Sequence, residues 1–330
     1  MQRRTFNAVA AGALLAPLAG GARAQKTAQS GQSGSWPSRP LKLMVGFPAG
    51  STPDVVARAL ADGLAGPLGQ PVVVENHPGA AGNLAASMVA KATDDHTLGI
   101  VINGNLTTAK VLNPALGFDP AQDFVPLSLL TTAPLALAAP ASLPAGAAFF
   151  EEAVKNGDRW NYGSVGNGSV AHLGMELLKS RVPGLLPVHV PFQGNPAVVT
   201  ALLGGQIQMA LVPPGLVVPH VKTGRLRIVG LTSGRSTLAP DAASLRESGI
   251  RDFNLEVWTA LVGPARLSAA AQARIAATVP ALLHEAEVRQ RLFNQGWAAV
   301  GSDAAATQAR VKIEAESLNA IIRTAHIQAD

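Results

Sequence analysis

The chain has 330 residues and a formal charge of +5, from 26 Lys and Arg against 21 Asp and Glu, and it contains no cysteine. The lack of cysteine excludes disulfides, thiolate metal sites, cysteine nucleophiles and a lipid-anchored cysteine. Aromatic residues make up only 4% of the chain and no cluster of Lys and Arg follows residue 24, which argues against a nucleic-acid surface.

Residues 1–24 have the pattern of a cleaved signal peptide. Arg3 and Arg4 precede an apolar run over residues 8–18, and Ala22-Arg23-Ala24 fits the small-x-small cleavage pattern. Neither this run nor any later one reaches the ~18 apolar residues that a bilayer helix requires. The order Arg3-Arg4-Thr5-Phe6 favours twin-arginine export, with the general secretory route as the alternative. Cleavage removes three arginines and no acid, so the formal charge falls to +2 and a soluble periplasmic product is expected.

Residues 25–38 are rich in Gln, Ser and Gly and indicate a flexible leader, which leaves enough chain for two domains of ordinary size. Beyond it, strand-like and helix-like runs alternate, a pattern typical of an α/β fold with mainly parallel sheets. The stretch 269–327 is predicted to be helical without strands. The expected strands are 41–45, 72–74, 98–102, 127–130, 135–139, 160–165, 188–192, 209–212, 226–231 and 257–262.

The segment LMVGFPAGSTPDVVARAL, residues 43–60, predicts a strand, a polar turn and an amphipathic helix. Thr52 is predicted as the N-cap and Pro53 as the first helical residue, with Asp54 in the first turn. Free N–H groups at such a helix start attract a carboxylate or phosphate, although Asp54 can satisfy part of that positive end. The alternative is an ordinary strand-to-helix connection.

Two further segments repeat this layout. In residues 160–179, a strand enters a Gly, Ser and Asn turn that leads into a helix with His172 near its start, and residues 191–206 join a strand to a helix opened by Asn195 and Pro196. Glycines let backbone N–H groups approach a ligand, and serines add hydroxyl donors. Three such turns together predict an anion site. His172 is expected to cap the second turn or to reach a bound anion.

Other chemistries find little support. Gly166, Gly168 and Ala171 fit the dinucleotide pattern G-x-G-x-x-A, but the acid expected about 20 residues later is missing. No GxxxxGK loop occurs, and neither Ser164 nor Ser169 lies in G-x-S-x-G. The seven histidines are scattered without metal-ligand spacing, so no metal and no cofactor are predicted.

Six ordered blocks together resemble the periplasmic substrate-binding proteins of tripartite tricarboxylate transporters, the Bug-type receptors. The resemblance runs from Trp36 almost to the end of the chain. It implies a type II periplasmic-binding-protein fold, with domain 1 at residues 39–127 plus 254–330 and domain 2 at residues 128–253, joined by two crossover segments. The blocks are WPSRPLKLMVGFPAGSTPDVVAR, LGQPVVVENHPGAAGN, NPALGFDPAQDFVPLSLL, YGSVGNGSVAHLGMELLK, VPFQGNPAVVTALLGGQIQMA and the stretch from VKTGRLR to LTSGR.

The resemblance also implies the ligand-binding residues, because such receptors hold a carboxylate between the two domains through backbone groups and waters. Domain 1 would contribute Phe47, Ala49, Gly50, Ser51, Thr52, Thr107 and Thr108. Domain 2 would contribute Ser164, Gly166, Asn167, Gly168, Ser169, Phe192, Gln193 and Gly194.

The chain departs from its relatives at two places. Relatives commonly read FPAGGSTD, where this chain has Ser51, Thr52 and Pro53 before Asp54. Many relatives also carry an acid at the position of Val212, and its replacement favours a carboxylate ligand without an amino group, provided that this position faces the cleft.

The function implied is a monomeric periplasmic receptor that captures a small organic carboxylate and delivers it to the membrane subunits of the transporter, with no bond made or broken. Nucleic acid is not expected as a partner. Two alternatives stay open. One is an exported enzyme that acts on a carboxylated substrate through His172 or Ser169, and the other is a receptor that serves a sensory partner.

Overall fold

The computed structural model describes residues 36–251, 253–324 and 327. The predicted signal peptide 1–24 and most of the predicted leader 25–38 lie outside these residues. Within them, none of the helices is both long and apolar enough to traverse a bilayer.

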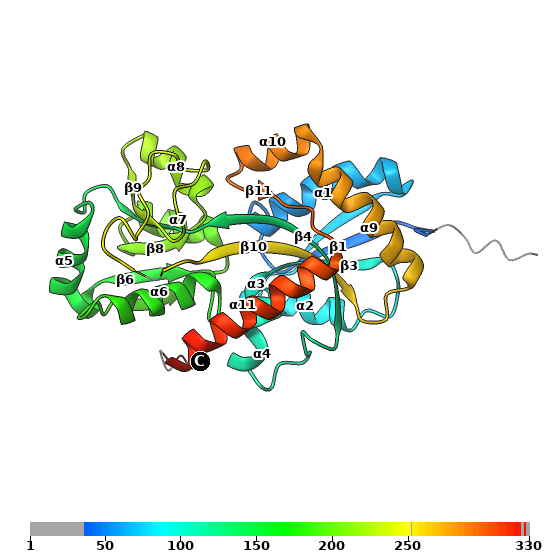
Figure 1. Ribbon diagram of the computed structural model, residues 1–330, viewed down its shortest axis with the longest axis horizontal. Coiled ribbons are helices and arrows are strands. Elements are labelled where there is room, and N and C mark those ends of the chain that lie inside the picture. The colour runs from blue at the N-terminus through cyan, green and yellow to red at the C-terminus, as the bar shows by residue number, and fades with distance from the viewer. Residues whose placement is uncertain (1–35, 252, 325–326, 328–330) are drawn as a thin grey trace, which may run out of the picture. The chain divides into compact units, whose positions relative to one another are not determined.

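The elements, labelled in Figure 1, are β1 (Leu41–Val45), α1 (Thr52–Leu68), β2 (Val72–Asn76), η1 (Ala80–Gly82), α2 (Asn83–Ala90), β3 (Thr97–Ile102), α3 (Asn103–Thr107), α4 (Ala109–Leu112), β4 (Phe124–Pro134), β5 (Ala136–Pro140), α5 (Ala147–Asn156), η2 (Gly157–Arg159), β6 (Asn161–Ser164), α6 (Val170–Arg181), β7 (Val188–Pro191), α7 (Asn195–Leu203), β8 (Met209–Val212), α8 (Pro214–Lys222), β9 (Leu226–Leu231), β10 (Glu256–Pro264), α9 (Ala269–His284), α10 (Ala286–Asn294), β11 (Ala298–Ala299) and α11 (Ala304–Thr324).

The strands form two mixed sheets. The six-stranded sheet has the order β11-β4-β10-β3-β1-β2, and the five-stranded sheet has the order β7-β6-β8-β5-β9. We call the six-stranded sheet with the helices packed on it the first lobe, and the five-stranded sheet with its helices the second lobe. The α/β fold class is confirmed. The predicted domain boundaries, 39–127 plus 254–330 and 128–253, stay a prediction.

The expectation of mainly parallel sheets is wrong. β1 runs parallel to β2 and β3, and β6 runs parallel to β7 and β8, but β10 is antiparallel to β3 and β4, and β5 is antiparallel to β8 and β9. The reason is the route of the chain, which leaves the first lobe through β4 and returns through β10 in the opposite direction (Figure 1). The predicted helical stretch 269–327 also contains a short strand, β11, which pairs with β4.

Helix α11 contacts both lobes. Near its start, Thr307 accepts a hydrogen bond from the backbone N–H of Leu129 in β4, at 2.8 Å. In its middle, Glu314 accepts from the indole N–H of Trp258 and from the amide of Asn103, each at 2.6 Å. Near its end, Leu318 is buried in the core of the second lobe with residues such as Phe149 and Leu173. The helix therefore lies along the β4 and β10 passage, as Figure 1 shows.

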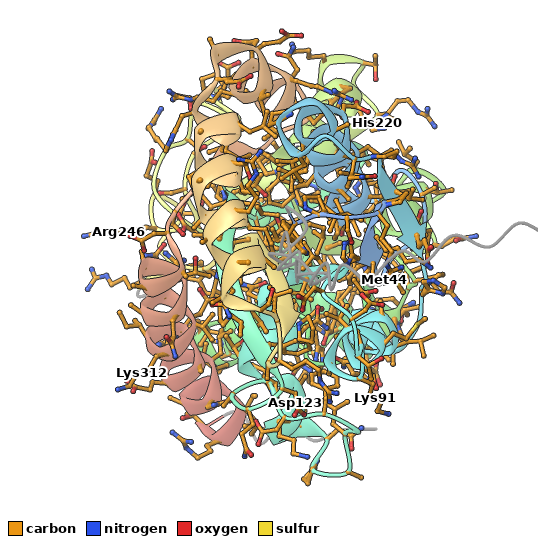
Figure 2. The ribbon with its side chains drawn as sticks, turned by 90° about the vertical axis from the view of Figure 1, so that its right-hand side faces the viewer. Met44, Lys91, Asp123, His220, Arg246 and Lys312 are labelled. Carbon is orange, nitrogen blue, oxygen red and sulfur yellow. The ribbon has the colours of Figure 1, made fainter. Side chains whose placement is uncertain are left out.

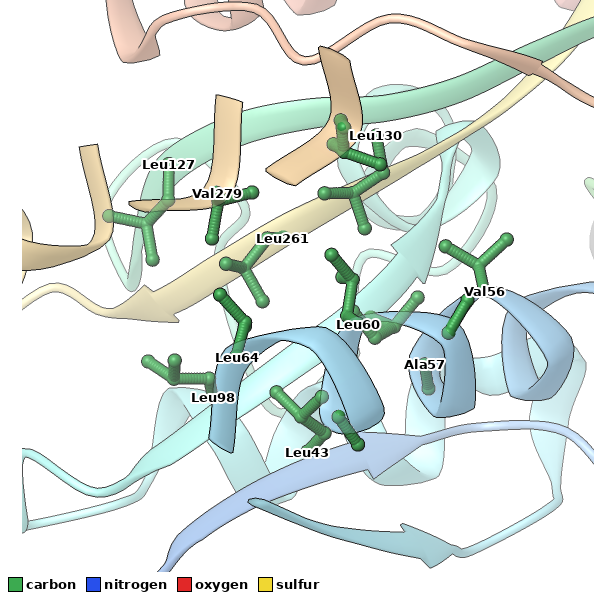
Figure 3. Packing of buried hydrophobic residues seen from close by; sticks show 14 of the residues in the cluster. Leu43, Val56, Ala57, Leu60, Leu64, Leu98, Leu127, Leu130, Leu261 and Val279 are labelled. Atoms are coloured by element: carbon green, nitrogen blue, oxygen red, sulfur yellow. The ribbon is translucent and has the colours of Figure 1, made fainter. Parts of the chain in front are cut away.

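The β1–α1 unit folds as its sequence pattern predicts. Val56, Leu60 and Leu64 of α1 are buried against Leu43 of β1 in one core cluster, which Figure 3 shows together with Val279 and other residues. Burial of such a side chain contributes roughly 1.5–3 kcal/mol. The predicted N-cap is wrong by one residue, because α1 begins at Thr52 and its N-cap is Ser51, with extended φ and ψ of −71° and 162°.

The turn between β1 and α1 is held by the carboxylate of Asp54. This side chain is buried and accepts hydrogen bonds from the backbone N–H of Gly50 at 2.8 Å, from the amide of Asn76 at 2.9 Å and from Arg58 at 3.0 Å. Burial opposes ionisation, but these hydrogen bonds and the charge of Arg58 outweigh it, so the pKa of Asp54 lies below its usual value. Ionised Asp54 therefore stabilises this turn.

We expect the substitution Asp54→Asn to lower the free energy of unfolding by about 1–3 kcal/mol, because it removes a buried charged acceptor that three donors share. Since the folded-state pKa lies below the unfolded value of about 3.9, this contribution is present above that pH and is lost as the pH falls through the folded pKa. Urea denaturation of the wild type and the variant across acidic pH measures both effects.

Asp62→Asn on the same helix is the matched control. Asp62 is 64% exposed and pairs with Arg291, so its loss is expected to cost less than about 1 kcal/mol. Equal losses in the free energy of unfolding for the two substitutions would show that Asp54 contributes no more than one member of a surface ion pair does.

Candidate functional site

A cavity of about 470 Å³ lies between the two lobes. Four short segments of the first lobe and two turns of the second lobe line it. The lining residues are 46–47, 79–83, 102, 104–105, 108–109, 112–113, 165–169 and 191–193. This volume is within the range of pockets that bind small molecules.

The turn at residues 165–169 is held from behind by side chains of the second lobe. Ser164 Oγ accepts a hydrogen bond from the backbone N–H of Gly166 at 3.1 Å. His172 Nδ1 accepts one from the N–H of Gly168, also at 3.1 Å. Ser169 is the N-cap of α6 and accepts from the N–H of His172 at 3.3 Å. The capping role expected of His172 is confirmed, and its ring does not line the cavity.

His172 belongs to a stack of three rings beneath this turn. Its ring lies 4.3 Å from that of His189 and nearly parallel to it, and the ring of Tyr162 lies 4.9 Å from that of His189. His189 Nε2 is 2.7 Å from Ser164 Oγ, and the hydroxyl of Tyr162 donates to Glu176 at 2.6 Å. These contacts restrict the side chains that position the turn.

A segment that sequence reasoning missed, residues 79–83, forms the opposite wall. Ala80 and Ala81 have positive φ angles of 48° and 53°, which are uncommon for alanine. The amide of Asn105 donates to the carbonyl of Ala81 at 3.0 Å and so holds the segment. The signal that could have found it is the PGAAGN run directly after β2, another glycine-rich strand-to-helix turn.

A second, smaller cavity adjoins the first and shares Phe47, Ile102 and Val165 with it. Its volume is about 30 Å³, which suits a carboxylate group or about two water molecules. Ser51 and Thr52 line it at the start of α1, and their hydroxyl oxygens are buried without a hydrogen-bond partner within the described residues. Buried polar atoms of this kind normally have partners, so this pair requires an explanation.

The structure brings together ten of the fifteen predicted site residues. Of the predicted residues, the large cavity is lined by Phe47, Thr108, Gly166, Asn167, Gly168, Ser169, Phe192 and Gln193, and the small one by Phe47, Ser51 and Thr52. Ala49, Gly50, Thr107, Ser164 and Gly194 line neither cavity. Three of these support neighbours, because Gly50 donates to Asp54, Thr107 donates to the carbonyl of Asn103, and Ser164 holds Gly166. Ligand contact itself stays a prediction for all fifteen.

The lining of both cavities is electrically neutral. Among the described residues that line either one, none is Asp, Glu, Lys, Arg or His. Charged side chains such as Lys91, Arg246 and Lys312 instead extend outward (Figure 2). No group of three His, Asp or Glu side chains in the described part of the chain is arranged to hold a metal.

Position 212 does not face the site. Val212 is fully buried in β8, packs with Val198 and Ala136, and lines neither cavity. The preference for a ligand without an amine therefore receives no support from this position. Its support comes from the neutral lining.

Comparison with known proteins identifies the family. A family model described as "Tripartite tricarboxylate transporter family receptor" (TctC) matches residues 56–327. A UPF0065 protein of Bordetella pertussis is 34% identical over 241 residues, which cover 72% of this chain and 74% of that protein.

Two solved structures have the same fold over most of this chain. Rpa4515 of R. palustris, solved with adipate, has a TM-score of 0.85 at 27% identity and covers 89% of this chain and 100% of its own. MatC of Rhodopseudomonas palustris, solved with bound malate, has a TM-score of 0.81 at 30% identity over 87% of this chain and 100% of its own. The chain belongs to the TctC family of tripartite tricarboxylate transporter receptors.

Proposed function

We propose that this receptor captures a small organic dicarboxylate between its two lobes in the periplasm and delivers it to the membrane subunits of a tripartite tricarboxylate-type transporter. One observation carries the proposal. The neutral cavity between the lobes adjoins a small cavity where two buried hydroxyls, those of Ser51 and Thr52, have no partner among the described residues.

The start of α1 is suited to bind a carboxylate group of the ligand. N–H groups at a helix start carry a partial positive charge and attract an anion without any cationic side chain. Asp54 lies in this first turn, but its oxygens accept from Gly50, Asn76 and Arg58. Ser51 makes no side-chain cap hydrogen bond. One carboxylate of the ligand would therefore accept from the hydroxyls of Ser51 and Thr52 at this helix start.

The second lobe would meet the rest of the ligand. Asn167 and Gln193 place amide groups at the large cavity. Phe192 of the same lobe, together with Leu112 and Ile102 of the first lobe, offers apolar surface for a short carbon chain. The ligands named for Rpa4515 and MatC, adipate and malate, are dicarboxylates of this size class. The neutral lining gives an ammonium group no counter-charge, so amino acids should bind more weakly.

Binding fits this cavity better than catalysis. General acid-base chemistry needs a titratable group within reach of the substrate, and the described lining offers none. Ser169 accepts from the N–H of His172 as a helix cap, and His172 Nδ1 accepts from Gly168. Both residues named for the enzyme alternative therefore have structural roles.

Titration calorimetry with adipate, malate, aspartate and glutamate tests the proposed ligand class. We expect the two dicarboxylates to bind at least about tenfold more tightly than the amino acids, because an unpaired buried ammonium costs more than about 1.4 kcal/mol. Tighter binding of aspartate or glutamate would contradict the neutral-site argument.

Ser51→Ala and Thr52→Val test the carboxylate position. Each removes a hydroxyl that we assign to a charged acceptor, so each should raise the Kd of the dicarboxylate by about 10-fold to 100-fold. The free energy of unfolding without ligand should stay unchanged or rise, since each substitution removes a buried hydroxyl that has no partner in the described part of the chain.

Ser169→Ala provides the matched control at the other lobe. It removes a cap that is hydrogen-bonded, so it should cost about 0.5–2 kcal/mol of stability. Loss of stability together with affinity in Ser51→Ala would mean that this hydroxyl serves the fold instead of the ligand.

Growth of a strain that lacks the gene, on the ligand identified by calorimetry as sole carbon source, tests delivery to a transporter. A growth defect that is restored by the wild type but not by Ser51→Ala is the expected result. Normal growth, with loss only of a transcriptional response to the ligand, would favour the sensory alternative.

A further inference from the structure

We propose that Thr108 is a positioning residue that fastens the two lobes together, and that it does so without contacting the ligand. Thr108 was predicted as a ligand contact, and it does lie at the large cavity. Its hydroxyl, however, donates across the boundary between the lobes to the carbonyl oxygen of Gly168, at 2.9 Å. This inference rests on the proposed function, in which a ligand is held between the two lobes, and it adds that the lobes close around that ligand.

The contact is buried and has a fixed partner. Thr108 is 0% exposed, and its Oγ1 also lies 3.2 Å from the carbonyl of Gly104. A hydroxyl donates only one hydrogen, and the shorter distance is that to Gly168. Because the site is shielded from water, a Gly168 carbonyl without this donor would lie buried and unsatisfied in the closed arrangement.

Gly168 is held at both of its backbone groups. Its N–H donates to His172 Nδ1 within the second lobe, and its carbonyl accepts from Thr108 of the first lobe. The turn therefore presents the carbonyl in a fixed position, and the hydrogen bond to Thr108 forms without further ordering of the turn. A pre-ordered acceptor of this kind loses little conformational entropy when the lobes meet.

The first lobe is shaped to receive this turn. A Cβ on Gly104 would lie 3.1 Å from the Gly168 carbonyl oxygen, and a Cβ on Gly168 would lie 2.4 Å from the Leu112 side chain. On the other side of Asn167, a Cβ on Gly166 would lie 2.9 Å from that of Ala81. The lobes thus touch on both sides of Asn167, and the glycines permit the close approach.

The role of Thr108 can be separated from ligand contact because fastening does not depend on which ligand is enclosed. Thr108→Val keeps the shape of the side chain and removes the donor. We expect it to raise the Kd values of adipate and malate by the same factor, about 5-fold to 50-fold. Thr108→Ser keeps the hydroxyl and should bind both ligands within about threefold of the wild type.

Gly104→Ala provides an independent variant that leaves the hydroxyl in place. Alanine is favoured over glycine in helix α3, so folding should be unharmed, while the added Cβ crowds the Gly168 carbonyl only when the lobes are together. We expect weaker binding of both ligands with an unchanged or higher urea midpoint.

Lobe separation can be measured directly because the chain contains no cysteine. Lys91→Cys and Lys155→Cys place two dyes on exposed residues, one in each lobe, for energy transfer measurements. Thr108→Val should shift the protein toward longer dye separations at subsaturating adipate, and Thr108→Ser should not. Unequal factors for adipate and malate, or equal behaviour of the Val and Ser variants, would overturn the proposal.

A failure of the proposed function is distinguishable from a failure of this inference. If the wild type binds neither adipate nor malate, the proposed ligand class fails. The dye separations of the unliganded wild type and Thr108→Val then decide the role of Thr108, since a fastening hydrogen bond predicts longer separations in the variant. Identical separations would overturn the inference.

Discussion

The carboxylate of Asp54 accepts hydrogen bonds from Gly50, Asn76 and Arg58, and this arrangement decides what the start of α1 can do. A carboxylate in the first turn of a helix commonly satisfies the N–H groups at that end. Asp54 binds the preceding turn and the end of β2 instead. The hydroxyls of Ser51 and Thr52 next to it have no partner among the described residues, and for this reason we propose an external carboxylate as their partner.

Local patterns in the sequence predicted the features that depend on local chemistry. The i, i+4 spacing of Val56, Leu60 and Leu64 predicted the buried face of α1, and the glycine and serine run after Tyr162 predicted the turn that Ser169 and His172 hold. The limits of most strands were correct to within a few residues. The N-cap of α1 was misplaced because Ser51 and Thr52 are both good capping residues.

Features that depend on contacts distant in sequence were not predictable in this way. The antiparallel pairing of β4 and β10 joins segments more than 100 residues apart, and no periodicity within either strand reports its neighbour. The wall at residues 79–83 depends on positive φ angles at Ala80 and Ala81, which Asn105 stabilises from 24 residues away. Whether position 212 faces the cleft was left open, because the alternation of β8 cannot show which face of a buried strand meets a ligand.

The role of Thr108 was not predictable for the same reason, because its partner is distant in sequence. Its position beside a predicted cleft suggested contact with the ligand, whereas its hydroxyl reaches a carbonyl 60 residues away. Contacts between the lobes and contacts with the ligand are therefore two separate determinants of affinity. In the role that we propose for it, the contact between Thr108 and Gly168 favours closure equally for any ligand that fits, so it changes affinity without changing selectivity. Under the proposed function, selectivity then comes from groups that meet the ligand itself: the hydroxyls at the start of α1, which we assign to a carboxylate, and the apolar lining, which we assign to its carbon chain. A receptor built in this way can change its ligand through the lining while the fastening of its lobes stays the same.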